Sequence, residues 1–370
     1  MKLSISRETL LKNLKHMQSV VEKRTSIPIL SNVLIKAENN RLMTTATDND
    51  MTVKGGAEAF VETEGATTVS AHKLYEIISK IPEGVMVNME LKDNGGRLAI
   101  TAGKAKFSLA CLSPEAFPDT DTLADGVTFS IPSAAFKKTL GKAIFAASTD
   151  ETRQYLNGVY MHVTDDEEPK LRFVATDGHR LSRVEMDLPE GAKEMNATIL
   201  PRKTVGELRK LCDEAKEVTL RVSDKKIQCE TEVVTLTSKV IDGAFPDYDR
   251  VIPYGNEKEM DISRQMLMQA VDRVAILSHE KSRSIKFSVK PNNLMITANN
   301  PDQENAVEDL KVEYSADEVS IGFNAKYVSE IGNHIESDDV SFFFKDGTSP
   351  VMVKDPADPS ALFVVMPMRI

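Results

Sequence analysis

The sequence predicts an α+β protein made of three repeated domains, each with two helices packed on antiparallel sheets. The first observation is a phrase that recurs: Phe173–Leu181 shares an Ala-Thr-Asp pattern with Met43–Asp50 and, more loosely, resembles Met295–Pro301. The alanines at positions 46, 175 and 298 in these copies lie 129 and 123 residues apart. That period has the size of a domain and is far longer than a solenoid repeat.

The second observation is that passages from a strand-like pattern into a helical pattern recur with a similar period. Three of them open a repeat, and three introduce a second helix that starts with a basic residue. The opening passages are Leu3–Arg7, Phe129–Ser133 and Met260–Arg264, and the later ones are Val69–Lys73, Ile199–Lys203 and Gly322–Lys326. Agreement of these markers in order and spacing predicts a triplicated unit.

Composition bounds the class of protein. With 370 residues, 41% hydrophobic and 28% charged, the chain has room for two or three cores. The repeat favours three, and we expect domains at 1–125, 126–253 and 254–370. No apolar run approaches the roughly 18 residues of a membrane span, and the first residues lack the apolar core of a signal peptide. We therefore expect a cytoplasmic protein.

Charge and cysteine content exclude further classes. The net charge of -10 argues against a uniformly basic coat for nucleic acid, although a local basic face is compatible with it. Cys111, Cys212 and Cys229 lack paired CxxC spacing, so we interpret them as reduced core thiols rather than as disulfides or a zinc site. Phosphate-loop, dinucleotide-binding and zinc-protease motifs are absent from the sequence. We expect neither a cofactor nor a metal.

The elements of the first domain follow from periodicity and turn residues. Apolar residues at helical spacing follow Ser6, a suitable N-cap, and predict a helix with one face on a sheet. Ile27–Leu30 has the composition of a strand, and alternating segments flank a turn at Asn39–Asn40. A second helix is predicted at His72–Ser79, and a hairpin turn at Asn94–Gly96.

The second and third domains repeat this order. Asn157–Gly158 predicts a turn within the strands of the second domain, and the acidic segment Thr164–Lys170 predicts a solvent-facing loop. An apolar strand ends the chain. The predicted helices are Ala134–Ala147, Lys203–Lys216, Gln265–Leu277 and Lys326–His334.

The joins between domains have their own repeat. Ala116–Asp121 and Ala244–Asp249 each place proline and two aspartates after an apolar anchor, which is typical of a connector. An alternative interpretation is that the Asp-x-Asp pairs hold magnesium for phosphoryl chemistry. Their occurrence at both joins favours the connector.

Two other segments allow two interpretations each. Asp177 and His179 suggest a catalytic base with its orienting carboxylate, but no nucleophile motif accompanies them, so a turn held by Asp177 and Gly178 is favoured. The apolar tail Val364–Met368 is either the last strand of the third domain or the lining of an adaptable pocket for short apolar peptides. Periodicity leaves both open.

Any single Lys or Arg near a helix start, taken alone, is expected to lie on the solvated surface. Six helices in three equivalent domains favour a shared basic surface instead, because related domains can present their helices on a common side. Many modest contacts there would attract phosphates without reading bases. Such binding is weak and sensitive to salt.

Five segments carry a resemblance to a known family: Tyr155–Gly158, Ala175–Leu181, Phe245–Tyr248, Thr297–Pro301 and Val364–Arg369. They closely resemble the bacterial DNA polymerase III beta subunits, or sliding clamps, and the match runs the full length. The resemblance implies three domains of one fold, with each chain forming half of a closed ring around duplex DNA. Helices would line the hole and sheets the outside.

The resemblance also implies activity and partners. A clamp catalyses nothing and needs no cofactor; it tethers the DNA polymerase III catalytic subunit topologically for processive synthesis. The implied partners are duplex DNA, bound without sequence specificity, and a second copy of the chain in a homodimer. The clamp loader, other polymerases and repair factors would dock through short linear motifs, and no membrane is involved.

Residues on three surfaces are assigned by the same resemblance. A partner-peptide pocket between the second and third domains matches Leu156, Thr176, Gly178, His179, Arg180, Leu181, Pro246, Arg250, Val251, Val364, Val365, Met366, Pro367, Met368 and Arg369. The DNA-facing positions are Arg24, Lys73, Lys80, Lys137, Lys138, Lys142, Arg202 and Lys203. The dimer interface matches Lys104, Lys106, Phe107, Leu109, Ile276, Leu277, Glu304 and Glu308. Carboxylates in the loop Thr149–Glu151 weaken the expectation that this loop holds phosphate.

The leading hypothesis is therefore a DNA-encircling processivity factor. The alternatives are a metal-dependent phosphohydrolase that uses the Asp-x-Asp pairs and a peptide-binding adaptor that does not encircle DNA. Retention on circular DNA, magnesium-dependent turnover of a phosphoester and a monomeric mass in solution distinguish the three.

Overall fold

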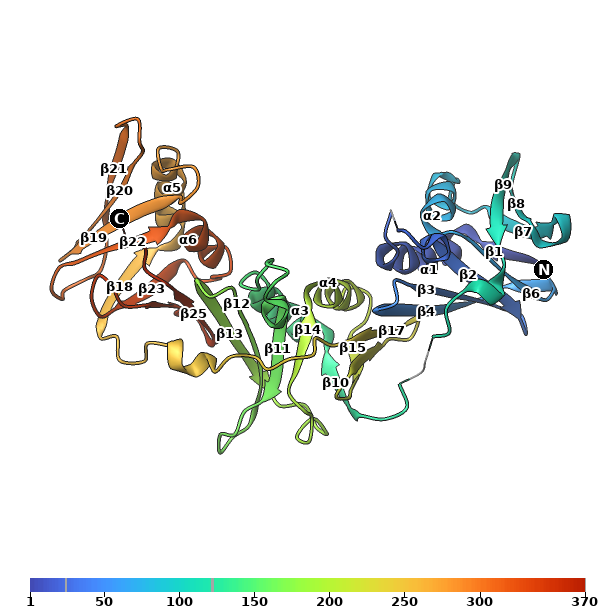
Figure 1. Ribbon diagram of the computed structural model, residues 1–370, viewed down its shortest axis with the longest axis horizontal. Coiled ribbons are helices and arrows are strands. Elements are labelled where there is room, and N and C mark those ends of the chain that lie inside the picture. The colour runs from blue at the N-terminus through green and yellow to red at the C-terminus, as the bar shows by residue number, and fades with distance from the viewer. Residues whose placement is uncertain (24, 121–122, 370) are drawn as a thin grey trace. The chain divides into compact units, whose positions relative to one another are not determined.

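The computed structural model describes residues 1–23, 25–120 and 123–369, so the prediction for Arg24 lies outside the described residues. Contacts between residues divide the chain into two compact units. The first comprises residues 1–137, 189–196 and 206–240, and the second comprises residues 138–188, 197–205 and 241–370. Figure 1 shows helices and strands in both. In the described ranges the α-helices are α1 (Arg7–Val20), α2 (Ala71–Lys80), α3 (Ser133–Ile144), α4 (Arg202–Leu211), α5 (Arg264–Ala275) and α6 (Ala325–Gly332).

The first unit contains one 13-stranded antiparallel sheet, in the order β10-β15-β16-β17-β4-β3-β2-β6-β9-β8-β7-β1-β5. Strands from two predicted domains join where β17 pairs with β4. The strands are β1 (Lys2–Ser6), β2 (Asn32–Glu38), β3 (Arg41–Thr47), β4 (Met51–Glu58), β5 (Phe60–Thr63), β6 (Gly65–Ser70), β7 (Met86–Lys92), β8 (Arg97–Ala102), β9 (Ala105–Leu112), β10 (Val127–Pro132), β15 (Glu217–Val222), β16 (Lys226–Glu230) and β17 (Val234–Lys239).

The second unit contains an 8-stranded sheet, β14-β11-β12-β13-β25-β24-β23-β18, and a 4-stranded sheet, β21-β20-β19-β22. Here the predicted middle and last domains share a sheet, because β13 pairs with β25. The strands are β11 (Gly158–Val163), β12 (Lys170–Thr176), β13 (Arg180–Asp187), β14 (Thr198–Pro201), β18 (Lys258–Ser263), β19 (Ser284–Lys290), β20 (Asn293–Asn299), β21 (Asn305–Lys311), β22 (Val319–Asn324), β23 (Asp339–Phe344), β24 (Val351–Asp355) and β25 (Asp358–Val365).

The predicted passages from strand to helix are confirmed at all six positions. Strands β1, β10 and β18 lead directly into α1, α3 and α5, and strands β6, β14 and β22 lead into α2, α4 and α6. At the first passage the Ser6 hydroxyl accepts a hydrogen bond from the Thr9 N–H at 3.1 Å, as an N-cap does. Leu10, Leu14 and Met17 then bury the inner face of α1, which packs on β3 and β4. Each repeat therefore supplies two helices to its sheets. No described helix is both long and apolar enough to cross a membrane.

The strand predicted at Ile27–Leu30 is wrong. A short 3₁₀ helix occupies Pro28–Ser31 instead, because Pro28 fixes a helical φ at a position where no N–H is needed. The predicted end of α4 at Lys216 is also too late. The helix ends at Leu211, after which the Asp213 N–H bonds to Lys210 O in a tightened turn.

The glycine at 158 lies in β11 and not in the predicted turn. A Cβ on Gly158 would stand 2.1 Å from Leu200 O, so the neighbouring strand β14 approaches too closely for any side chain. Close packing of two strands therefore requires this glycine.

Candidate docking site

The site predicted to bind partner peptides lies where β13 meets β25 in the second unit. Arg180 and Leu181 are paired with Val365 and Val364 in this antiparallel ladder. The tail continues the arrangement, because the Met366 N–H donates to His179 O at 2.8 Å. Strand pairing thus brings together predicted pocket residues that lie far apart in the sequence.

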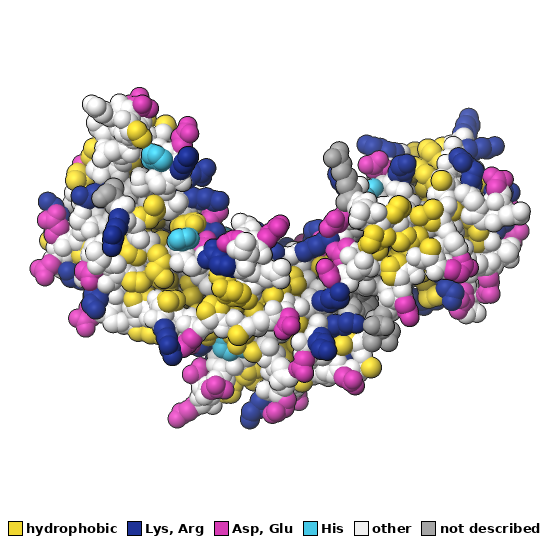
Figure 2. Space-filling view, viewed as in Figure 1, with side chains coloured by type: hydrophobic (Ala, Val, Ile, Leu, Met, Phe, Trp, Pro, Cys, Tyr) yellow, Lys and Arg dark blue, Asp and Glu magenta, His cyan; other side chains and the backbone are white. Residues whose placement is uncertain are grey.

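A buried apolar cluster lies behind this ladder. Two predicted pocket residues, Leu181 and Val364, belong to it. Figure 2 shows hydrophobic side chains gathered where β25 and β13 lie in Figure 1. The other buried members are Val174, Tyr248, Ile252, Met352 and Leu362. Sequence reasoning missed these five, although the unbroken apolar run that contains Leu362 indicates a strand buried on both faces.

The remaining predicted pocket residues surround the cluster at different depths. Leu156 and Val365 are buried, while Thr176, Met366, Pro367 and Met368 are half-buried. The exposed members are Gly178, His179, Pro246, Arg250, Val251 and Arg369. An apolar interior with an exposed, partly polar margin suits a surface that binds an apolar anchor side chain.

Arg180 is the buried centre of the site. Its Nε lies 3.2 Å from Asp177 Oδ2, one Nη donates to Glu330 of α6, and the other donates to Phe145 O at 2.6 Å. The guanidinium also faces the rings of Phe145 and Tyr327, at 5.2 Å and 4.7 Å from their centroids. Arg180 therefore holds β13 against α6 and the segment after α3.

Burial lowers the pKa of the Arg180 guanidinium, and the neighbouring Asp177 opposes that effect. Each of the three guanidinium nitrogens of Arg180 is engaged within the chain, so Arg180 orders the surface around the predicted pocket. Tyr327 and Glu330 were missed from the sequence. The aromatic residue one position after the basic start of the last predicted helix was the available signal.

The turn before Arg180 is held as predicted. Asp177 Oδ1 accepts hydrogen bonds from the His179 N–H at 2.9 Å and the Arg180 N–H at 3.0 Å. Gly178 has φ +89°, a backbone region that side chains disfavour. Asp177 is thus a turn residue, and the His179 ring is stacked on Tyr327 with 6.2 Å between centroids.

Aromatic residues anchor the connector that follows the second repeat. Phe245 stacks on Tyr160 with 4.8 Å between centroids. The Tyr248 hydroxyl meets His162 Nε2 and Arg172 Nη1, each at 2.9 Å. Burial raises the pKa of Tyr248 to about 12, despite the opposing effect of Arg172. The connector therefore forms part of the packed site.

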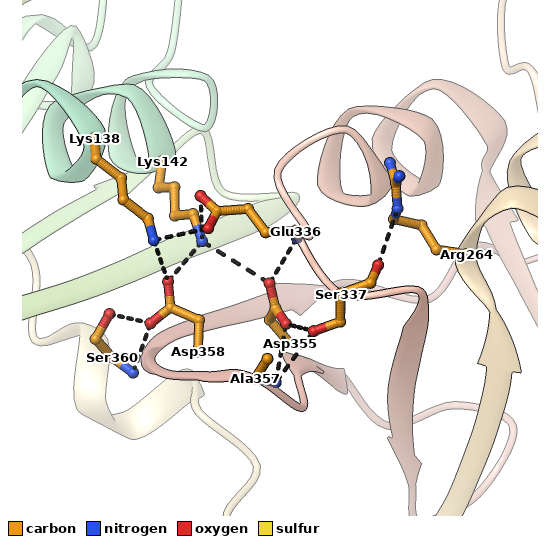
Figure 3. Close-up of polar contacts among 9 residues, drawn as sticks. All are labelled: Lys138, Lys142, Arg264, Glu336, Ser337, Asp355, Ala357, Asp358 and Ser360. Atoms are coloured by element: carbon orange, nitrogen blue, oxygen red, sulfur yellow. Dashed lines mark hydrogen bonds and ion pairs between the residues drawn. The ribbon is translucent and has the colours of Figure 1, made fainter.

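Charged residues tie α3 to the hairpin between β24 and β25 (Figure 3). Lys142 Nζ donates to Asp358 Oδ2 at 2.7 Å and lies 3.3 Å from Glu336 and 3.9 Å from Asp355. Its side chain is buried, so the prediction that Lys142 faces DNA is wrong. The carboxylates that surround the ammonium group replace the phosphate contact expected from sequence.

The hairpin carboxylates are fixed by their own donors. Asp355 accepts hydrogen bonds from the Glu336 N–H at 2.7 Å, the Ala357 N–H at 3.1 Å and the Ser337 hydroxyl. Burial alone would raise the pKa of Asp355 and of Asp358. At Asp355 the three donors and Lys142 outweigh burial, and at Asp358 Lys142 and Ser360 do so, which lowers both pKa values. Both side chains are therefore ionised at neutral pH.

The other cations predicted to face DNA divide into two groups. Lys73, Lys80, Arg202 and Lys203 are exposed on α2 and α4. Two more on α3 are engaged by carboxylates: Lys137 is paired with Asp213, and Lys138 with Glu336 and Asp358. The exposure of the first group is compatible with the predicted phosphate contacts.

The residues predicted at the dimer interface lie on β9 and β21, directly before these two strands, or directly after α5. In the first unit, β9 pairs with β8, and only Cys111 and Leu112 pair with β6 on its other side. In the second unit, β21 is the terminal strand of the 4-stranded sheet. Lys104, Lys106 and Phe107 are exposed, whereas Leu109 and Leu277 are half-buried. Each open edge presents unpaired backbone groups to another chain.

Beside β21, two predicted interface residues differ in availability. Ile276 is highly exposed after α5, but Glu308 is ion-paired with Arg273, whose Nε donates at 3.0 Å. That hydrogen bond lowers the pKa of Glu308. The Glu304 backbone N–H donates a hydrogen bond to the side-chain oxygen of Asn300. The Glu304 carboxylate accepts one from the Asn300 side-chain amide at 2.6 Å.

The alternative magnesium site receives no support in the described residues. Asp247 is ion-paired with Arg250 at 2.7 Å, and Asp121 of the other pair lies outside the described residues. No group of three or more described His, Cys, Asp or Glu side chains has an arrangement that holds a metal.

Fold and site together define a class: a protein of three repeated α+β domains whose distinctive surface is a strand junction suited to binding a peptide. Comparison with known families identifies all three domains. The N-terminal, central and C-terminal domain models of the DNA polymerase III beta subunit match residues 1–121, 130–247 and 249–369. The chain therefore belongs to the DNA polymerase III beta subunit family, and the three-domain α+β prediction is confirmed.

Individual relatives match over their whole length. A beta sliding clamp of Caulobacter vibrioides is 45% identical, and that of Escherichia coli K12 is 37% identical, with 100% of each chain covered. A crystal structure of a DnaN sliding clamp from Bartonella birtlesii bound to griselimycin is 39% identical. It superposes with a TM-score of 0.97 over 100% of both chains.

Proposed function

We propose that this chain is a sliding clamp, which closes with a second copy into a ring around duplex DNA and tethers DNA polymerase III during synthesis. The observation that carries this conclusion is the succession of three beta-subunit domains along a chain that matches sliding clamps from end to end. The function is non-catalytic, because a clamp contributes processivity and no chemistry. Its place of action is the cytoplasm, where the DNA lies.

Two open strand edges support the head-to-tail dimer. The β9 edge of one copy and the β21 edge of the other would satisfy each other's backbone groups, with Phe107 and Ile276 supplying apolar contact. Lys104 and Lys106 would face Glu304 across the joint. Two such joints close a ring of two chains.

The chain's charge suits sliding on DNA. A net charge of -10 limits adhesion, while exposed cations on α2 and α4 offer phosphates weak contacts that salt readily screens. Retention then depends on ring closure. We expect the protein to stay on circular DNA and to leave after the circle is cut, and equal retention on both forms would contradict encirclement.

The strand junction is the proposed docking site for polymerase III, the clamp loader, other polymerases and repair factors. Short linear motifs would insert a Leu or Phe side chain above Leu181 and Val364, beside the tail. Deletion of residues 366–370 tests this assignment, because it removes the tail but neither interface strand. We expect loss of peptide binding with the dimer intact. Unchanged peptide affinity would show that the tail is not part of the docking site.

A further inference from the structure

A polar hollow lies on the solvent face of the 4-stranded sheet, beside the C-terminal tail. It has a volume of about 720 Å³. Three of its lining residues, Pro367, Met368 and Arg369, also belong to the predicted peptide pocket. The sheet side is lined by Lys286, Asn299, Ser320, Ile321 and Gly322, and the loop side by Gly347 and Thr348. The hollow therefore continues the docking site onto a sheet that the predicted pocket does not include.

Strand register explains why the hollow exists. Lys286 of β19 lies opposite Gly322 of β22, so the position beside the lysine stem carries no side chain. Since β22 ends the sheet, its outer edge is open to the tail. The Met368 N–H donates to Gly322 O at 2.8 Å and holds the tail along that edge. One wall is thus the tail, and the floor is the sheet.

The hollow has two cations without counterions. Among the described residues, neither Lys286 Nζ nor the Arg369 guanidinium has a hydrogen-bond or ion-pair partner, and both side chains are exposed. The nearby carboxylate of Asp346 is directed to its own turn, where it accepts the Thr348 N–H and the Ser349 N–H at 2.8 Å each. In a chain with a net charge of -10, this local excess of positive charge favours an anion.

We propose that this hollow binds an acidic side chain that flanks the docking motif of a partner protein. The inference rests on the proposed function, because the tail is a wall of both sites. The planar guanidinium of Arg369, on the tail, can donate two hydrogen bonds to one carboxylate, and Lys286 adds a point charge from the sheet. The Asn299 amide offers a further donor. Two cations in one hollow suit a single carboxylate better than a nucleic acid, which requires a longer track of positive charge.

The test compares three fluorescent peptides that carry the docking motif of the polymerase III catalytic subunit. One has the motif alone, one has Asp residues on both sides, and one has Asn residues at the same positions. Each is titrated by fluorescence polarisation against full-length wild type, Lys286→Gln and Lys290→Gln. Lys290 is the matched control, since it lies on the same strand, is exposed and pairs with Glu318 outside the hollow.

Wild type should bind the Asp-flanked peptide about fivefold more tightly than the Asn-flanked one at low salt, as expected for exposed charge pairs. Lys286→Gln should reduce that preference to about twofold or less, and Lys290→Gln should keep it. High salt should weaken it in wild type. The motif alone should bind wild type and Lys286→Gln equally, which shows that the variant is folded and its docking site intact.

Equal binding of the Asp-flanked and Asn-flanked peptides to wild type would overturn this inference while leaving the proposed function standing. Failure of the motif alone to bind wild type would count against the docking function itself. If Lys286→Gln weakens retention on circular DNA but keeps the peptide preference, the hollow contacts nucleic acid and the inference is wrong.

Discussion

Lys142 and Asp358 are joined by an ammonium–carboxylate hydrogen bond of 2.7 Å that ties α3 to the β24–β25 hairpin. Only 5% of the lysine side chain and 14% of the aspartate side chain are exposed. Lys142→Met would leave Asp355 and Asp358 without their buried counterion, and such a loss costs about 3 kcal/mol. We expect the free energy of unfolding in urea to fall by about that amount.

Lys138→Met is the matched control for this prediction. Lys138 binds Glu336 and Asp358 from the same helix, but nearly half of its side chain is exposed. Exposed pairs contribute less than about 1 kcal/mol. Equal destabilisation by the two substitutions would show that burial of Lys142 does not determine its contribution.

The pKa of Asp358 predicts a dependence of stability on acid. Burial alone would raise this pKa, but the hydrogen bonds from Lys142 and Ser360 outweigh it and hold the pKa well below its ordinary value. The folded chain therefore binds fewer protons here than the unfolded chain. Its contribution is present above the unfolded pKa of about 3.9 and is lost as pH falls towards the folded pKa.

We thus expect the free energy of unfolding of the wild type to decline below about pH 4, measured by urea denaturation across a pH series. In Asp358→Asn the decline should be shallower, although the variant is less stable at neutral pH. Parallel pH profiles for the two proteins would contradict the assignment.

Local pattern and period predicted the fold well. Each of the six strand-to-helix passages depends on neighbouring residues, as the Ser6 cap of α1 does, and recurrence reinforced each weak local signal. The strand predicted at Ile27–Leu30 does not form, because the backbone restriction of Pro28 outweighs the β propensity of its neighbours. Local chemistry decided the outcome in both cases.

The charge network of the site was beyond local reasoning. Lys142 shares a helix with other cations, but the carboxylate that binds it lies 216 positions later. Likewise, Arg180 and Glu330 are 150 positions apart. A sequence shows each charge without its partner, so Lys142 resembles a surface lysine until the hairpin is packed against α3. Family resemblance located the strand junction but not these partners.

Arg180→Lys should destabilise the second unit, although it preserves the charge. One ammonium group cannot reach Asp177, Glu330 and Phe145 O together, which leaves a buried carbonyl without its donor. We expect a loss of about 2 kcal/mol in free energy of unfolding and about tenfold weaker binding of a docking-motif peptide.

Arg250→Lys serves as the comparison for stability. Arg250 pairs with Asp247, but 84% of its side chain is exposed, so the change should stay within about 0.5 kcal/mol. If Arg180→Lys is as stable as Arg250→Lys and binds the peptide normally, Arg180 does not organise the site.

Substitutions on the two open edges test ring closure. Phe107→Asp on β9 and Ile276→Asp after α5 each place a charge where apolar contact is proposed, and we expect each to weaken the dimer by about 2 kcal/mol or more. Sedimentation velocity measures the shift to monomer. Phe60→Asp on β5 is the control, because Phe60 is 68% exposed on a terminal strand of the same sheet, away from β9.

A mixture of the two interface variants tests the direction of assembly. In a head-to-tail dimer, the intact β9 edge of the Ile276→Asp chain can meet the intact β21 side of the Phe107→Asp chain, whereas the other joint carries both substitutions. The mixture should recover dimers by sedimentation but should not remain on circular DNA, because the second joint stays open. Recovery of both dimer and retention would contradict the assigned joint, and a mixture that stays monomeric would contradict head-to-tail pairing.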